Sequence, residues 1–180
     1  MENDTEVMNL LANQKGSELF EKAKQEYPYL ADKDITFKYS PNPADQRMLE
    51  FYHPEESERP EYMPAGKVGI EVFNPKTGTL DILGDYVSHY GVQVDPNLKS
   101  LYEQFGQSLD PQMMMNRYAY YKSNLGENRP FEQWMETSGL PEMFRGYTFK
   151  QWGSEDESKQ MYTPEQLEIL DKVRSYLNVQ

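Results

Sequence analysis

The spacing of apolar residues predicts a helix near the start of the chain. Between residues 4 and 26, apolar residues recur three or four positions apart, which is the period of one face of an α-helix. Gly16 and Ser17 interrupt this pattern, so the helix is expected either whole or in two pieces. It should end at Tyr27, because a residue that precedes proline, here Pro28, is disfavoured in the helical conformation.

The pattern changes to a period of two in the next part of the chain, which is typical of half-buried strands. The candidate strands are residues 35–39, 48–52 and 67–73. We expect them to form a small antiparallel sheet. After the turn residues 74–78, residues 79–83 either return as a hairpin strand or begin a helix that reaches Tyr90. Residues 54–64 are rich in Pro and Glu and have no period, which predicts a loop.

Beyond residue 90 the sequence predicts short helices with clear starts. Asp95, Asp110 and Thr163 each precede a proline, which places a capping side chain before a residue whose φ suits the first turn. Thr163 and Gln166 also have the spacing of a capping box. The expected helices cover residues 96–105, 111–125, 130–139, 141–146 and 164–177.

Together these elements predict an α+β fold, in which a small antiparallel sheet packs against several short helices and helical segments flank both ends. We expect residues 1–153 to form a single domain, with residues 1–30 as its helical N-terminal flank. Residues 154–162 are expected to be an acidic linker. Residues 163–180 should form a C-terminal helix that docks on the same chain, because its apolar stripe needs a covering surface.

Composition locates the expected contact surface in the middle of the chain. The 180 residues carry 30 acids and 18 bases, for a net charge of −12, and only 37% of them are hydrophobic. Residues 63–153 have a net charge of only −2 and hold 14 of the 24 aromatic residues. Aromatic side chains bury large areas, so we expect the core and any apolar contact surface to lie there.

Several classes of function are disfavoured by what the sequence lacks. It has no cysteine, which excludes disulfide scaffolds, zinc fingers and thiol catalysis. It has no apolar run long enough for a membrane helix, and its acidic first residues predict no secretory signal. The negative charge disfavours direct binding to nucleic acid and to anionic membranes. No phosphate-binding glycine motif is present, and no cofactor is predicted.

One cluster could carry catalysis. Asp85 and His89 are one helical turn apart and Ser88 adjoins the histidine, which could combine a base, its orienting carboxylate and a nucleophile. The alternative is a surface histidine bonded to a carboxylate one turn away. We favour the second interpretation, because triad side chains normally converge from different elements. No catalytic residue is therefore assigned; if the protein is an enzyme, these three residues are the candidates.

Several carboxylates could in principle serve as metal ligands. Magnesium needs only one or two carboxylates with water molecules. The carboxylates considered for such a site are Glu50, Glu71, Asp81 and Asp85. The restriction-type nuclease pattern also needs a lysine two positions after its glutamate, and Phe73 stands there after Glu71. No metal site is predicted.

A partner surface is the favoured use of the aromatic middle. Methionine adapts its shape to varied surfaces, and tyrosine, tryptophan and arginine dominate the energetics of protein interfaces. The predicted partner-binding residues are Met113, Tyr118, Tyr120, Tyr121, Trp134 and Arg145. Taken singly, the tyrosines and two of the three methionines at 113–115 are expected to serve core packing first, and Arg145 to form a structural ion pair with Asp85 or Glu142.

Three segments resemble parts of uncharacterised proteins encoded by tailed bacteriophages. They are LEFYHP (49–54), PAGKVGIEVFNPKTGTLDILGDYVSHYG (64–91) and RPFEQWMETSGLPEMFRGYTFKQW (129–152). The resemblance covers about residues 48–153, and its most specific parts are GDYVSHYG and SGLPEMFRGY. It implies a viral setting and no particular activity.

We therefore expect a non-enzymatic, phage-encoded interaction or assembly protein, located in the virion or the host cytoplasm. Its partner would be another protein, from the phage or the host, and an oligomer is possible. Two alternatives stay open. One is an acidic inhibitor that mimics nucleic acid on a basic host protein. The other is a hydrolase or nuclease that uses Asp85 and His89.

Overall fold

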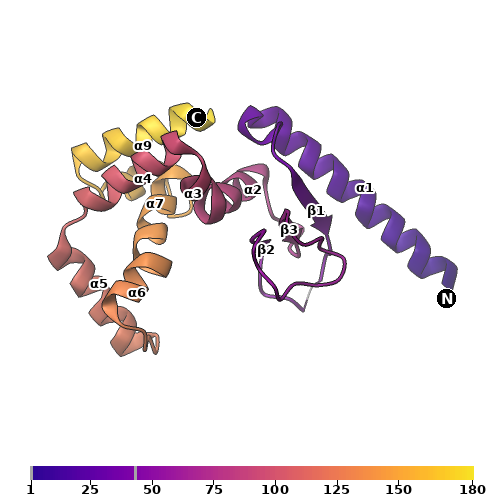
Figure 1. Ribbon diagram of the computed structural model, residues 1–180, viewed down its shortest axis with the longest axis horizontal. Helices are drawn as coiled ribbons and strands as arrows, with labels where there is room; N and C mark the ends of the chain where they lie inside the picture. The colour runs from indigo at the N-terminus through magenta and orange to yellow at the C-terminus, as the bar shows by residue number, and fades with distance from the viewer. Residues whose placement is uncertain (1, 43) are drawn as a thin grey trace. The chain divides into compact units, whose positions relative to one another are not determined.

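The computed structural model describes residues 2–42 and 44–180, and the chain divides into two compact units (Figure 1). The first unit is Met1–Tyr90 and the second is Gly91–Gln180. The expected single domain over residues 1–153 is therefore corrected to a division after residue 90. The reason is that each unit has a core of its own, built around Ile70 in the first unit and around Phe144 in the second, both with 0% exposure.

The α+β fold class is confirmed, with the strands confined to the first unit. The elements of the first unit are α1 (Glu2–Glu26), the 3₁₀ turn η1 (Pro28–Leu30), β1 (Ile35–Tyr39), β2 (Leu49–Tyr52), β3 (Val68–Val72) and α2 (Thr79–Tyr86). The π-helical turn η2 (Val87–Gly91) follows α2, and its last residue is the first of the second unit. The elements of the second unit are α3 (Val92–Val94), α4 (Pro96–Ser108), α5 (Pro111–Asn124), α6 (Phe131–Trp134), the π-helical turn η3 (Met135–Gly139), α7 (Leu140–Thr148), α8 (Glu155–Lys159) and α9 (Pro164–Leu177).

The three predicted strands are confirmed, but the expectation of an antiparallel sheet is wrong in one pairing. The strand order is β1-β3-β2, with β3 parallel to β1 and antiparallel to β2. The parallel pairing is possible because the chain between β1 and β3 is long enough to return to the starting edge. The pairing register places two rows of side chains on opposite faces. These rows are Phe37, Ile70 and Phe51 on the apolar face, and Lys38, Glu71 and Glu50 on the polar face.

Helix α1 is one unbroken helix of 25 residues that packs on β1 and α2. Phe20 stacks on Phe37 with ring centroids 4.8 Å apart. Gly16 does not end a helix segment but allows a close contact, since a Cβ atom there would lie 2.6 Å from the Cβ of Tyr39. Among the described residues, neither this helix nor any other is both long enough and apolar enough to cross a membrane.

Residues 79–83 adopt the helical alternative rather than the hairpin strand. The side chain of Asp81 accepts a hydrogen bond from the backbone N–H of Gly78 at 2.8 Å, which satisfies one of the free donors at the start of α2. Ile82 and Leu83 are fully buried on the inner side of this helix. A local cap and a buried helical face thus decide between the two alternatives.

The loop at residues 54–64 lies over the polar face of the sheet. The Arg59 guanidinium donates to the backbone carbonyls of His53, Pro64 and Lys67, the last at 2.9 Å. Met63 is only 2% exposed, and its sulfur lies against Gly69 on β3. One arginine therefore organises a segment that has no periodic pattern of its own.

The second unit is helical, and its predicted caps are confirmed. Asp95, Asp110 and Thr163 each accept a backbone N–H at the start of their helix. Helix α9 docks on α4 and α7, as expected, with Leu170 fully buried. The expected linker at residues 154–162 is corrected, because it contains α8, which begins with a capping box at Ser154.

Candidate functional site

The structure brings the Asp85–His89 pair together on α2 and η2. His89 Nε2 lies 3.3 Å from Asp85 Oδ1, and the side chain of Asp85 is 5% exposed while that of His89 is 49% exposed. The His89 ring stacks on Phe51 of β2 with centroids 5.2 Å apart. The pair therefore joins a buried carboxylate to a half-exposed ring that packs on the sheet.

Ser88 does not complete a catalytic set in this structure. Its Oγ is buried and has no hydrogen-bond partner among the described residues, so no bond joins it to His89. Nucleophilic serines are activated by a base within hydrogen-bond reach. Phe51, on which the His89 ring stacks, is also in contact with the rings of His53 and Tyr90, each at 6.5 Å between centroids. The surroundings of His89 thus resemble those of a packed structural residue.

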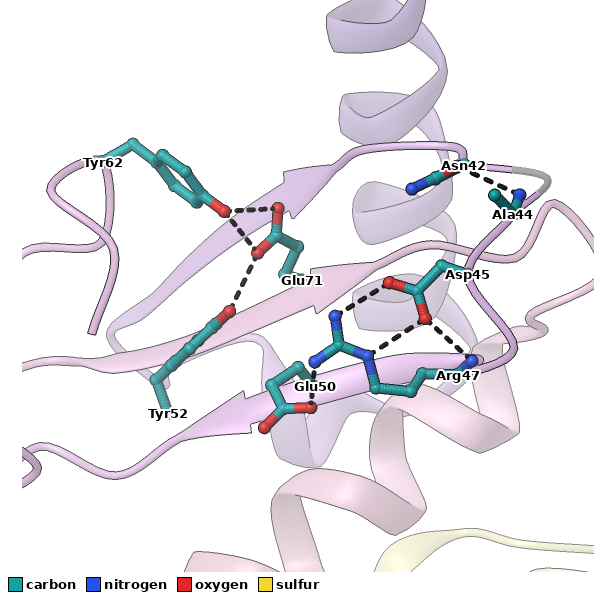
Figure 2. A network of polar contacts seen from close by, with 8 residues as sticks. All are labelled: Asn42, Ala44, Asp45, Arg47, Glu50, Tyr52, Tyr62 and Glu71. Atoms are coloured by element: carbon teal, nitrogen blue, oxygen red, sulfur yellow. Dashed lines mark hydrogen bonds and ion pairs between the residues drawn. The ribbon is translucent and has the colours of Figure 1, made fainter. Parts of the chain in front are cut away.

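A second polar cluster lies on the polar face of the sheet, shown in Figure 2. Glu71 is 1% exposed and accepts hydrogen bonds from the hydroxyls of Tyr52 and Tyr62, each at 2.9 Å. Burial, followed by the hydrogen bond to Glu71, raises the pKa of both tyrosines. The hydrogen bonds of this buried carboxylate come from its own chain, so it stabilises the fold. Glu71 and Tyr62 also lie among the residues that line a second cleft, of about 750 Å³, beside α1.

The carboxylates that could serve as magnesium ligands each interact with a different group of the protein. Glu50 binds Arg47 at 3.0 Å, Asp81 caps α2, and Asp85 contacts His89. Over residues 2–42 and 44–180, no three His, Asp or Glu side chains are grouped so that they could hold a metal ion.

Trp134, a predicted partner-binding residue, is corrected to a core residue. Its side chain is 0% exposed, with the rings of Tyr118 and Tyr121 each 5.5 Å from it, centroid to centroid. The Tyr118 hydroxyl donates to the backbone carbonyl of Arg129 at 2.5 Å. A buried tryptophan removes a large apolar area from water, so Trp134 contributes to the core of the second unit.

The other predicted partner-binding residues have different surroundings. Tyr120 is 59% exposed, whereas Met113 and Arg145 are partly buried. Of the predicted partner-binding residues, Tyr121 lines a cleft of the second unit. Contact of these residues with a partner stays a prediction.

The cleft that includes Tyr121 is the candidate site, and we call it the Trp152 cleft. It has a volume of about 620 Å³, within the range of small-ligand and side-chain pockets. Helices α5, α7 and α8 and the turns beside α8 form it. Its lining residues are Arg117, Tyr121, Glu142, Trp152, Gly153, Glu157, Ser158 and Met161.

Trp152 is held in place by a glycine of α7. A Cβ atom on Gly146 would lie 2.4 Å from Cδ2 of the indole, so only glycine lets the ring approach the helix this closely. The carbonyl of Gly146 also accepts from the backbone N–H of Trp152 at 3.3 Å. Tyr162 stacks on the indole with centroids 6.1 Å apart. The ring is therefore positioned before any ligand arrives.

The polar groups of the Trp152 cleft interact with one another. The Tyr121 hydroxyl donates to Glu142 Oε2 at 2.7 Å, and the Arg117 guanidinium lies 3.8 Å from the same oxygen. Burial, followed by the hydrogen bond to Glu142, raises the pKa of Tyr121. Arg117 also lies over the Trp152 ring at 5.3 Å. The remaining apolar surface comes from Trp152 and from Met161, which is 45% exposed.

This geometry suits binding, because a concave apolar surface is combined with polar groups that are already oriented. Sequence reasoning missed Trp152 and Met161, since the first follows a predicted helix and the second lies in the expected linker. Gly146 and Trp152 both fall in the segment at 129–152, and the relation of this segment to phage proteins stays a prediction. No protein-family model, curated protein or solved structure matches the chain.

Proposed function

We propose that this protein is a non-enzymatic interaction protein that binds a partner protein through the Trp152 cleft. The observation that carries the proposal is the exposed apolar surface of Trp152 and Met161 in a cleft of about 620 Å³. Aromatic and arginine side chains in concave, well-packed positions supply much of the binding energy at protein interfaces.

The partner is expected to insert an apolar side chain. Of the three charged groups of the cleft, Arg117 and Glu142 lie close to each other and so compensate one another. The third, Glu157, accepts hydrogen bonds from the backbone N–H and the hydroxyl of Ser154. Contact with the indole and with Met161 then contributes most of the affinity, and apolar contacts depend little on ionic strength. The resemblance to tailed-bacteriophage proteins supports a phage structural protein or a host protein as this partner.

Site-specific photocrosslinking tests the proposal. A photoreactive amino acid placed at Met161 should crosslink the partner during expression in infected or native cells. The same amino acid at Leu125, which is 60% exposed and lies outside the cleft, is the control. A crosslinked protein that appears from position 161 and not from 125 supports the proposal, and equal capture from both positions contradicts it.

Substitution then measures the contribution of the cleft. Met161→Glu introduces a charge that must lose water on binding, so it should weaken the purified complex at least about tenfold. Leu125→Glu makes the same chemical change outside the cleft and should have no effect. A complex that dissociates at moderate salt and ignores Met161→Glu would favour the acidic mimic. A folded His89→Ala variant that loses biological activity while still binding would favour the hydrolase.

A further inference from the structure

The first half of α1 carries an exposed stripe with apolar residues in its centre and opposite charges at its ends. Asp4, Met8, Leu11 and Lys15 are spaced four, three and four residues apart, which aligns them along one side of a helix. Met8 is 69% exposed and Leu11 is 51% exposed. Both charged residues are exposed as well.

This stripe is not the face by which α1 packs on its own unit. Gly16 lies against Tyr39, the last residue of β1. The part of α1 that precedes Gly16 therefore extends beyond the end of this strand (Figure 1). Leu11 lies five residues before Gly16, which at 3.6 residues per turn points it about 140° away from that contact. Met8 lies eight residues before Gly16, about 80° from the contact, at the rim of a cleft that Tyr39 and Phe73 also line. Leu11 thus points away from the packing of the first unit, and Met8 is 69% exposed at its edge.

The stripe on one α1 helix is complementary to the same stripe on a second α1 helix that runs in the opposite direction. In two antiparallel helices, each residue faces the one equally far from the centre of the pair. A centre between residues 9 and 10 places Asp4 opposite Lys15 of a second copy. The same centre places Met8 opposite Leu11. Two-fold symmetry repeats each of these contacts.

We propose that this chain forms a homodimer through an antiparallel pair of α1 helices that meet along this stripe. Met8 and Leu11 pack between the helices, and Asp4 pairs with Lys15 at both ends. A parallel pair would instead place Asp4 on Asp4 and Lys15 on Lys15, which costs energy. A uniformly basic partner would attract Asp4 and repel Lys15. Charge complementarity therefore favours a second copy in the antiparallel orientation.

Sedimentation equilibrium of the full chain tests for the dimer. Because the apolar contact is short, the dimer should be weak. The average molar mass of the wild type should therefore rise with concentration from 21.2 kDa, the mass of one chain, toward twice that value. Leu11→Glu should remain at the chain mass over the same range, with unchanged helical circular dichroism. A wild type that stays monomeric, or a dimer that tolerates Leu11→Glu, overturns the proposal. Neither outcome bears on the Trp152 cleft, because Leu11 lies in the other unit.

Charge reversal tests the orientation of the pair. Asp4→Lys and Lys15→Asp should each weaken the dimer about tenfold, since each creates two like-charge contacts. The double variant restores opposite charges and should return the dissociation constant to within about threefold of the wild type. Glu6→Lys is the matched control, because Glu6 lies on the opposite side of the helix and should leave dimerisation unchanged. Absence of rescue by the double variant contradicts the antiparallel arrangement.

Discussion

Glu71 in the first unit and Glu142 in the second each form a hydrogen bond with a tyrosine, but they do so in different surroundings. Each carboxylate accepts a hydrogen bond from a tyrosine hydroxyl, at 2.9 Å from Tyr52 and at 2.7 Å from Tyr121. Glu71 is 1% exposed, whereas the side chain of Glu142 is 36% exposed. The comparison teaches that burial decides whether such a pair stabilises the fold or forms part of a binding surface.

The difference comes from what covers each carboxylate. The loop at residues 54–64 places Tyr62 over Glu71 (Figure 2). The Arg59 guanidinium holds this loop through its bond to the backbone carbonyl of Lys67. Glu142 has the open Trp152 cleft on its outer side. In the first arrangement the carboxylate itself is 1% exposed, although it borders a cleft of about 750 Å³. The second arrangement leaves one apolar wall free.

The largest effect is expected from removal of Glu71. Glu71→Ala leaves the buried hydroxyl of Tyr52 without its acceptor and should lower the free energy of unfolding by roughly 2–3 kcal/mol. Glu142→Ala should cost only about 0.5 kcal/mol, since water can reach the Tyr121 hydroxyl. Urea unfolding, with amide hydrogen exchange in β3 and α7 to separate the units, measures both. Equal losses would show that burial does not distinguish the pairs.

A smaller effect is expected from methyl groups added at two glycines. Gly146→Ala forces the rigid indole of Trp152 to move and should cost about 2 kcal/mol, with a change in tryptophan fluorescence. In Gly69→Ala, the nearest atom is the Met63 sulfur at 2.9 Å, on a flexible side chain. That variant should cost about 1 kcal/mol. A Gly146→Ala protein with unchanged fluorescence would mean that the indole is not fixed by this contact.

Alkaline pH should destabilise the second unit through its buried tyrosines. Burial raises the pKa of Tyr102 and of Tyr147 to about 12, and the hydrogen bond to Asp171 adds to the shift of Tyr147. Unfolded tyrosine has a pKa of about 10, so above that pH the unfolded state loses protons that the folded state keeps. Stability is thus fully present below about pH 10 and falls as the pH approaches 12. Urea unfolding over this range should show the decline, and Tyr147→Phe should reduce it.

The smallest effects are expected from single hydroxyls. Tyr52→Phe removes a buried hydrogen bond and should cost about 1 kcal/mol, whereas Tyr121→Phe should cost about 0.5 kcal/mol. A double-mutant cycle of Tyr52→Phe with Glu71→Gln gives the coupling energy of the buried pair directly. A coupling energy no larger than that of Tyr121 with Glu142 would remove the distinction between the two sites.

Local signals in the sequence were sufficient for the elements themselves. The alternation at residues 67–73 predicted β3, and Asp95 and Asp110 marked the starts of two helices because capping is a local interaction. The orientation of β1 was not predictable in this way. Whether a strand pairs parallel or antiparallel depends on the path of the chain between the strands, and alternation carries no information about that path.

The candidate site was only partly predictable for a related reason. Asp85 and His89 share one helical turn, so their contact could be foreseen from spacing. Trp134 and Trp152 look alike as sequence, yet one is fully buried and the other lines the Trp152 cleft. Only tertiary packing separates them, because the close approach of Trp152 depends on Gly146 in a different element.

The strand order has a consequence for synthesis of the chain on the ribosome. The central strand, β3, is also the last of the three to be made, and neither β1 nor β2 pairs with the other. Until residue 68 has left the exit tunnel, the nascent chain contains two strands with no neighbour to bond. The sheet therefore forms late in synthesis, when β3 becomes available and pairs with β1 on one side and β2 on the other.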